Sequence, residues 1–325
     1  MCLPKMTFMK THAVVMQAPE HLQLMHLALT DPGDADVVVD IEFSGISTGT
    51  ERLLWNGSMP TFPGMGYPLV PGYESVGNVV AAGPNSQRQV GDHVYVPGAR
   101  CYGEVRGLFG GAASRLVVPG EKVLPISDSL GANAVLLALA ATAYHAVACG
   151  GKTAPRRPPE LIVGHGVLGR LLARLVVASG FPAPTVWELN PARASGAVGY
   201  PVITPDEDTR RDYQAIYDVS GDSGILDKAI ARLAYGGEVV LAGFYTEPLR
   251  FNFAPAFMRE AQIRTAAEWK RADMLAVKEL TEDGRLSLDG LITHQDVATH
   301  AAEAYRTAFG DAACLKMILD WRTLQ

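Results

Sequence analysis

LIVGHGVLGR, residues 161–170, is the stretch of sequence that decides the fold. Three apolar residues lead into a GxGxxG pattern, and an apolar helical pattern over residues 167–179 follows it. In this order of strand, loop and helix, the glycines permit a tight turn, close approach of a pyrophosphate and close packing of the helix on the strand. The helix N-terminus adds free N–H groups and a positive dipole. We therefore expect a dinucleotide to bind at Gly164, His165, Gly166, Val167, Leu168 and Gly169.

A carboxylate follows where such a loop needs one. Glu188 ends a second apolar run, about 20 residues beyond the last motif glycine. A carboxylate there accepts hydrogen bonds from the ribose hydroxyls and repels a 2′-phosphate, so the sequence favours NAD over NADP. Arg193 nearby keeps NADP open. The alternative is a glycine-rich turn without cofactor, in which Glu188 caps the next loop.

Two later strand ends extend the predicted cofactor site. The segments 218–221 and 241–245 each close an apolar run with glycine and polar residues. Open α/β sheets bind ligands at the carboxyl ends of their strands, so we expect Ser220 and Gly243 beside the cofactor. Phe244 and Tyr245 could contact substrate, although ordinary core packing is the more frequent role of such aromatics.

The remaining pattern predicts two domains. Residues 11–125 carry short β-rich runs separated by glycine and proline turns, with an irregular loop over residues 61–72. A helix capped by Ser127 or Asp128 and stopped by Gly150 precedes the second part. There, apolar strands alternate with helices, the pattern of a parallel sheet. The expected strands are 160–164, 185–188, 215–219, 238–243 and 263–267.

The boundaries of these domains follow from the change of pattern. We expect a β-rich domain over residues 1–130 and an α/β domain over residues 131–270. Residues 271–325, with a helix to about residue 283, another over 297–309 and a late strand over 315–321, are expected to return partly to the first domain.

Composition and charge exclude several classes of protein. The 325 residues carry 28 Lys and Arg against 34 Asp and Glu, a net charge of −6, so no basic surface for nucleic acid is expected. The four cysteines, Cys2, Cys101, Cys149 and Cys314, form no CxxC pair, which argues against a disulfide framework or a zinc finger. Without a secretion signal or an uninterrupted membrane span, a cytoplasmic location is expected.

Four motifs in a fixed order carry a family resemblance: GISTGTE at 45–51, PGYESVGNVVAAG at 71–83, TAYHA at 142–146 and GHGVLG at 164–169. The chain resembles the medium-chain dehydrogenase/reductase superfamily. The resemblance implies a Rossmann-type parallel sheet domain and a β-rich GroES-like catalytic domain. Longer stretches, such as SGISTGTERLLW and YRTAFGDAACLKMILDW, resemble the branch that oxidises the 3-(1-hydroxyethyl) group of a chlorophyllide or bacteriochlorophyllide to 3-acetyl in bacteriochlorophyll a biosynthesis, with NAD as cofactor.

The zinc ligands of many superfamily members are missing from this sequence. Where those members carry a cysteine and a histidine, this chain has Ser47, or Thr48 with one extra residue, and Tyr73. The third ligand position falls among residues 138–141, which are alanine and leucine. Hydroxyls and methyl groups do not make a zinc site. We therefore expect no protein-bound metal.

Without a Lewis acid, the alcohol proton must pass to a side chain or a water chain. The resemblance places several polar groups beside the substrate, and Tyr73 and Glu74 are the first candidates, followed by His145 and Ser47. Each has an alternative role: Tyr73 as a space-filling side chain, Glu74 as a brace to Arg52 or Arg115, His145 as a buried helix histidine, and Ser47 as a turn residue. Thr142 is expected to contact the nicotinamide.

The implied substrate is a flat apolar pigment, for which apolar side chains form a suitable surface. Arg106 and Arg115 are candidates for a propionate. Rival functions are a zinc-free quinone or enone reductase and a non-catalytic dinucleotide-binding scaffold. The resemblance makes a homodimer the default expectation and leaves peripheral membrane contact open. The apolar candidates are Met59, Phe62, Met65, Tyr67, Phe109, Phe251, Phe253, Phe257 and Met258.

Overall fold

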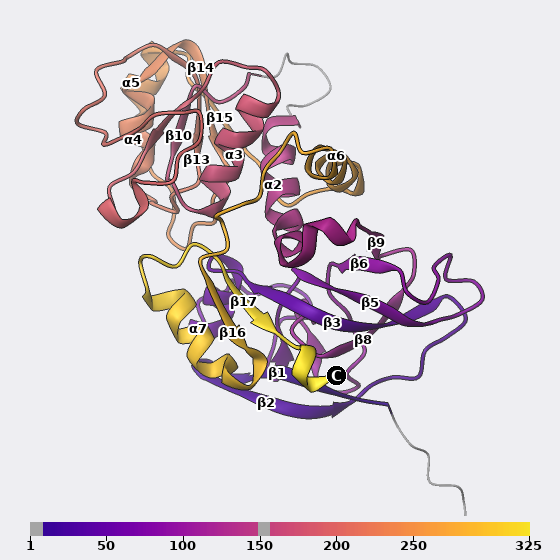
Figure 1. Ribbon diagram of the computed structural model, residues 1–325. Coiled ribbons are helices and arrows are strands. Elements are labelled where there is room, and N and C mark those ends of the chain that lie inside the picture. Colours follow the sequence, from indigo (N-terminus) through magenta and orange to yellow (C-terminus); the bar gives the residue numbers. More distant parts are fainter. Residues whose placement is uncertain (1–8, 149–156) are drawn as a thin grey trace, which may run out of the picture. The chain divides into compact units, whose positions relative to one another are not determined.

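The computed structural model describes residues 9–148 and 157–325 and divides the chain into two units (Figure 1). The first unit comprises Met1–Leu136 and Ile292–Gln325, and the second comprises Leu137–Leu291. These units divide the chain after Leu136 and after Leu291, whereas the expected domains divide it after residues 130 and 270, with a partial return of residues 271–325. Residues 271–291 lie with the second unit, because helix α6 (Arg271–Glu282) packs on helix α2 (Leu137–Ala148) there.

The second unit contains a parallel six-stranded sheet in the order β12-β11-β10-β13-β14-β15. The strand order changes direction between β10 and β13, which is where open α/β sheets bind their ligands. The expected parallel sheet is confirmed, with strand ends shifted by a few residues. The strands are β10 (Leu161–Val163), β11 (Thr185–Trp187), β12 (Val202–Ile203), β13 (Tyr213–Asp218), β14 (Leu233–Leu241) and β15 (Gln262–Thr265), and the other helices are α3 (Val167–Ala178), α4 (Ile225–Ile230) and α5 (Phe253–Met258).

The first unit is β-rich, as expected, and contains two sheets. One sheet has the order β16-β17-β3-β5-β6-β9, with β8 also paired to β3, and the other has the order β2-β1-β4-β7. The late strand β17 pairs antiparallel with β3, so the end of the described chain returns to this unit. The strands are β1 (Lys10–Ala18), β2 (His21–Ala28), β3 (Asp36–Ile46), β4 (Leu69–Val70), β5 (Ser75–Ala82), β6 (His93–Val96), β7 (Arg106–Gly107), β8 (Arg115–Pro119), β9 (Leu124–Pro125), β16 (His294–Val297) and β17 (Met317–Asp320).

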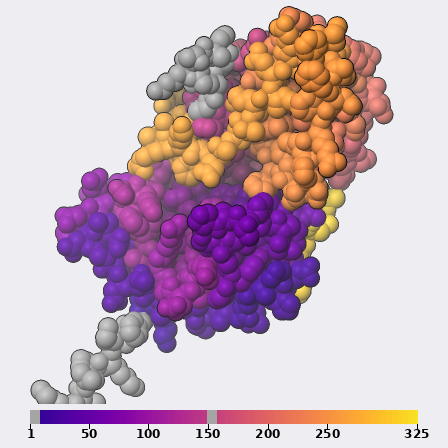
Figure 2. All heavy atoms as spheres, turned by 180° about the vertical axis from the view of Figure 1, so that it is seen from behind, coloured from indigo at the N-terminus to yellow at the C-terminus, as the bar shows by residue number. Residues whose placement is uncertain are grey.

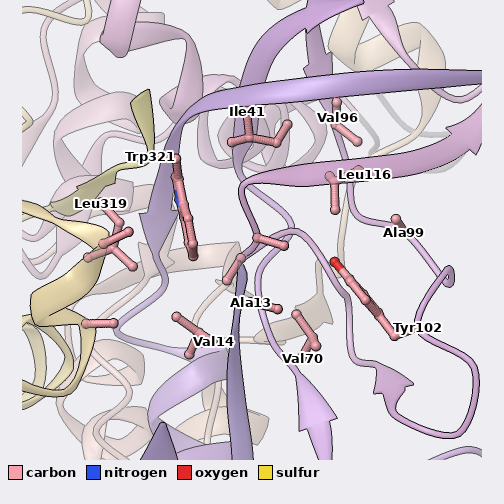
Figure 3. Packing of buried hydrophobic residues seen from close by; sticks show 14 of the residues in the cluster. Ala13, Val14, Ile41, Val70, Val96, Ala99, Tyr102, Leu116, Leu319 and Trp321 are labelled. Atoms are coloured by element: carbon pink, nitrogen blue, oxygen red, sulfur yellow. The ribbon is translucent and has the colours of Figure 1, made fainter. Parts of the chain in front are cut away.

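The core of the first unit joins the early strands to the returning segment (Figure 3). Trp321 is fully buried near Ile41 and Leu319, and its indole N–H donates to Ser44 Oγ at 2.8 Å. Burying a side chain such as Ile41 contributes roughly 2 kcal/mol to the free energy of unfolding. The same unit carries the helices α1 (Thr50–Asn56) and α7 (Ala301–Gly310), of which α1 was not expected.

The segment after Ser127 is not one continuous helix. A 3₁₀ segment, η1 (Asp128–Leu136), is broken at Gly131, whose φ of 47° and ψ of −136° are not helical, and α2 follows. Ser127 Oγ accepts the N–H of Ser129, as a cap does. The expected stop at Gly150 and the proline-rich connector fall largely on residues 149–156, outside the described residues.

The apolar character of this segment has a structural explanation. Asp128–Ala148 is 21 residues long and contains an 18-residue window with a mean hydropathy of 1.5, enough by length and composition to cross a membrane. Half of that window is buried, and α2 packs against both α3 and α6. Core helices of globular units meet the same criterion, so we interpret α2 as one. Cys101 and Cys314 are buried and form no disulfide within residues 9–148 and 157–325; Cys2 and Cys149 lie outside the described residues.

Candidate functional site

The glycine loop of the second unit has the geometry of a phosphate-binding turn. Gly164 follows β10 with a φ of +102°, and a Cβ at Gly169 would lie 1.9 Å from the carbonyl oxygen of Gly164. By contrast, no atom lies within 4 Å of a Cβ built at Gly166, which precedes α3 without a side-chain cap. The first N–H groups of α3 are thus open to an anion beside Gly166, and the loop fits a pyrophosphate.

Glu188 stands directly after β11 and is tied to this loop. One carboxylate oxygen accepts the backbone N–H of His165 at 3.0 Å, and the other accepts the N–H of Asn190 at 2.7 Å. The alternative role as a loop cap is therefore present. A carboxylate has about four acceptor positions, so the two oxygens retain capacity for ribose hydroxyls.

His165 is a buried structural residue of the glycine loop. Its Nδ1 lies 2.6 Å from the carbonyl oxygen of Arg193, which only accepts, so the neutral ring donates there and Nε2 accepts from Tyr200 Oη at 2.9 Å. Burial lowers the pKa of His165. Arg170 links the glycine loop to the segment after β11, because its guanidinium donates to the carbonyl oxygens of His165 and Ser195. With both ring nitrogens engaged, His165 does not act as a base.

The ends of β10, β13 and β14 meet beside the loop, which brings Gly164, Ser220 and Gly243 together. A Cβ at Gly164 would lie 3.2 Å from Ser220 Cα, and one at Gly243 would lie 3.4 Å from Tyr245 Oη. Ser220 Oγ and Tyr245 Oη both donate to the buried carboxylate of Asp218. Burial raises the pKa of Asp218. Tyr245, considered for substrate contact, thus directs its hydroxyl to the strand end.

The two polar candidates on α2 are held within the second unit. Thr142 Oγ1 donates to the carbonyl oxygen of Ala138 at 2.9 Å, which leaves its acceptor positions for other groups. His145 Nδ1 lies 2.7 Å from Asp273 on α6, and both side chains are buried. The geometry favours the alternative role of His145 as a paired helix histidine. Its partner is 128 residues away in sequence, so no local signal pointed to it.

Ser47 and Tyr73 form a hydroxyl pair in the first unit. Their oxygens are 2.7 Å apart, and Thr50 Oγ1 lies 3.4 Å from Tyr73 Oη. Tyr95 donates to the Tyr73 carbonyl at 2.5 Å, and Phe109 packs edge-on to the Tyr73 ring at 5.5 Å. Burial, and then the charge of Glu74, raise the pKa of Tyr73. The phenol is therefore neutral at physiological pH and hydrogen-bonds as O–H.

Glu74 has a different partner from those expected. It is fully buried and accepts from Lys316 Nζ at 2.6 Å, while Arg115 pairs with Asp40 instead. Lys316, also buried, donates a second bond to the carbonyl oxygen of Ile46 at 3.2 Å. The brace to Arg52 or Arg115 is wrong. The ion pair with Lys316 favours a structural role for Glu74, and its role as proton acceptor stays a prediction.

Glu51 is a residue that sequence reasoning undervalued. It is buried on α1, accepts the N–H of Ser47 at 3.0 Å and accepts from Tyr305 Oη at 2.5 Å. Burial raises its pKa from 4.5 to about 7. In the sequence it was one of several polar residues in segments that the resemblance places at the cleft, and it was not chosen as a candidate.

The donor set around Ser47 and Tyr73 does not fit zinc. The two hydroxyls bond each other, and Glu74 is occupied by Lys316. Among residues 9–148 and 157–325, no three His, Cys, Asp or Glu side chains are grouped as a metal site. Zinc needs thiolate, imidazole or carboxylate ligands.

Several proposed pigment contacts have structural roles instead. Met59, Met65 and Tyr67 pack against the core of the first unit, and Tyr67 Oη donates to the carbonyl oxygen of Leu54. Arg106 bonds the carbonyl oxygen of Tyr67 at 3.3 Å, and Arg115 is engaged by Asp40. In the second unit, by contrast, large apolar side chains lie at the surface around α5 and β15.

Comparison with known proteins decides the family. The family model of the alcohol dehydrogenase GroES-like domain matches residues 33–128. The 2-desacetyl-2-hydroxyethyl bacteriochlorophyllide A dehydrogenase of Rhodobacter capsulatus is 58% identical over 97% of this chain and 99% of its own length. This protein belongs to that dehydrogenase family. The enzyme of the same name from Cereibacter sphaeroides is 55% identical over 97% of this chain and 99% of its length.

Solved structures agree with the fold. The alcohol dehydrogenase RspB of Escherichia coli, in complex with NADH, superposes with a TM-score of 0.80 at 21% identity, covering 96% of this chain and 99% of that one. The 2R,3R-butanediol dehydrogenase of Bacillus subtilis reaches 0.82 at 20% identity, over 95% and 99%. The dehydrogenase thus has the two-domain fold of the medium-chain superfamily that its motifs predicted.

Proposed function

We propose that this dehydrogenase uses NAD, without zinc, to oxidise the 3-(1-hydroxyethyl) group of a bacteriochlorophyllide or chlorophyllide to acetyl. The substrate is inferred from one observation, the 58% identity over nearly the whole chain to a relative that bears this activity in its name. The second unit supports the cofactor, since its glycine loop is open to a pyrophosphate at Gly166.

The cofactor supplies the hydride acceptor when it is bound. Gly166 and the first N–H groups of α3 would hold its phosphates, and Glu188 would accept bonds from its ribose hydroxyls. The ends of β13 and β14, with Ser220 and Gly243, border the same loop. Because Glu188 would repel a 2′-phosphate, NAD should turn over faster than NADP.

Ser47 and Tyr73 supply the acid–base chemistry of the proposal. A neutral phenol 2.7 Å from a serine hydroxyl can accept the alcohol proton while it gives its own proton to Ser47, whose hydroxyl proton then leaves to a water molecule. The geometry therefore supports a hydroxyl relay, not a single strong base. His145, which pairs with Asp273, and Glu74 are not assigned to this step.

The test is a direct assay of the purified protein with NAD and a hydroxyethyl pigment. NADH should appear together with the long-wavelength shift that an acetyl carbonyl gives by joining the ring conjugation. Tyr73→Phe should lower kcat by about 100-fold, the usual size of a lost proton-transfer group. Tyr102→Phe is the matched control, since that hydroxyl is buried in the same unit and bonds the carbonyl oxygen of Gly110 and the side chain of Cys101. An unchanged spectrum without NADH rejects the proposal, and turnover with NADPH and a quinone would favour the reductase.

We also propose that the enzyme is a homodimer formed through the second unit. Large apolar side chains are exposed around α5 and next to β15, which ends its sheet. The segment around residue 250 is orange in Figure 2 and contributes a broad area of surface. An apolar patch beside an unpaired strand edge suits a second copy related by a two-fold axis. The exposed residues are Tyr235, Phe251, Phe253, Phe257, Met258 and Ile263.

Light scattering during gel filtration checks the dimer. The wild type should have twice the chain mass of 34.7 kDa. Phe253→Glu with Phe257→Glu should give a monomer, whereas Phe181→Glu, a control at another exposed aromatic of the same unit, should not. A wild-type monomer contradicts the proposal, and if that monomer co-sediments with lipid vesicles, the patch is a membrane contact instead. A cytoplasmic location stays a prediction.

A further inference from the structure

Around the Ser47–Tyr73 hydroxyl pair, buried carboxylates outnumber buried ammonium groups among the described residues. Glu51 and Glu74 are both buried, and Lys316 is the one buried ammonium that contacts either of them among the described residues. Lys316 pairs with Glu74 at 2.6 Å, so Glu51 is left with two hydrogen bonds and no cation in contact. An unpaired buried carboxylate is costly, which makes such a residue in an enzyme interior a candidate for function.

Glu51 hydrogen-bonds to both backbone groups of Ser47, its N–H and its carbonyl oxygen. Its carboxylate accepts the Ser47 N–H at 3.0 Å, and its own backbone N–H donates to the Ser47 carbonyl oxygen at 3.1 Å. The position of Ser47, and with it the 2.7 Å contact to Tyr73, is therefore set by Glu51. Hydrogen bonds to an ionised acceptor are roughly twice as strong as those to a neutral one, so protonation of Glu51 loosens this hold.

The second bond to Glu51 comes from helix α7, far along the chain. Tyr305 Oη donates at 2.5 Å and is fully buried. The other charged or titratable groups that face Glu51 are Tyr73, Glu74 and Lys316. None of these replaces the Tyr305 bond, because Glu74 and Lys316 are committed to each other.

We propose that Glu51 is a positioning residue for the oxidation: its carboxylate, held by Tyr305, orients the Ser47–Tyr73 pair toward the alcohol, and its protonation weakens that pair. This inference rests on the proposed function. Since burial raises the pKa of Glu51 to about 7, the change falls in the physiological range. Ionised Glu51 is the active form, and activity rises with pH.

The pH profile of kcat/KM for the pigment tests the proposal. In the wild type it should rise with an inflection near pH 7. Glu51→Gln should remove the inflection and lower the high-pH rate by about tenfold, the effect of a weakened charge-assisted bond. Tyr305→Phe, which deletes a bond to the ionised form, should move the inflection up by about one pH unit. Glu104→Gln, at an exposed acid, is the control and should leave the profile unchanged.

Loss of rate without any change in the pH profile would make Glu51 and Tyr305 merely structural and would overturn the inference. A spectroscopic readout separates this failure from failure of the proposed function. The ultraviolet difference spectrum between wild type and Tyr73→Phe should change between pH 6 and 8, on either side of the pKa of about 7, and should not change in the Glu51→Gln background. If the enzyme is inactive on the pigment but still shows this spectral change, the proposed substrate is wrong and the coupling of Glu51 to the Ser47–Tyr73 pair stands. If the spectrum does not change with pH, that coupling is disproved.

Discussion

Lys316→Met should lower the free energy of unfolding of the first unit by about 3–5 kcal/mol, the usual cost of removing one partner from a buried ion pair. Glu74 is fully buried, and its Oε1 has no hydrogen-bond partner even in the native protein. Without Lys316 its Oε2 also loses its bond at 2.6 Å, and the carboxylate is left uncompensated. The carbonyl oxygen of Ile46 loses a donor as well.

Urea denaturation of the wild type and of Lys316→Met, followed by a signal from the first unit, measures this loss in the free energy of unfolding. Arg322→Met, which breaks a partly exposed ion pair with Asp320 in the same unit, should change stability by less than about 1 kcal/mol and is the matched control. The double variant Lys316→Met with Glu74→Leu should recover much of the loss, because no charge then remains buried. A single variant as stable as the control would show that the pair is not strongly coupled to folding.

The parallel sheet of the second unit could be predicted, apart from the short strand β12, because its signals are local. The apolar run before Gly164, the three glycines and the helical pattern after them lie within about 20 residues, and each step has a physical reason. Glu188 lay at the expected strand end, next to the loop. Its two bonds to backbone N–H groups were not predictable from the sequence, since they depend on the course of the loop after β11.

The candidate site in the first unit was predicted only as a list of polar residues. The sequence indicated Ser47 and Tyr73 but did not show that they bond each other, and it placed Glu74 with the wrong cation. Lys316 is 242 residues away from Glu74, and Tyr305 is 254 residues away from Glu51. Such contacts come from the return of the chain to this unit, which local pattern does not specify.

Gly169→Val should abolish measurable NAD binding, because the glycine loop cannot keep its shape with a side chain there. A Cβ at this position would lie 1.9 Å from the carbonyl oxygen of Gly164, a backbone atom that only moves with the loop. We expect the dissociation constant for NAD, measured by calorimetry, to rise by more than about 100-fold, or roughly 3 kcal/mol. The melting temperature should fall too, because the strand and helix no longer pack closely.

Gly166→Ala tests whether a pyrophosphate approaches the backbone at this glycine, because the substitution leaves the shape of the loop unchanged. Nothing lies within 4 Å of a Cβ at Gly166, and its φ of −72° suits alanine, so the free protein should keep its stability within about 0.5 kcal/mol. The methyl group would nevertheless occupy the space through which a pyrophosphate reaches the backbone, so NAD affinity should fall by about tenfold or more. Gly310→Ala, with equally open space at the end of α7, is the control for both measurements. Wild-type affinity in Gly166→Ala would mean that the phosphates do not lie over this glycine, and the cofactor site would have to be placed elsewhere along the sheet edge.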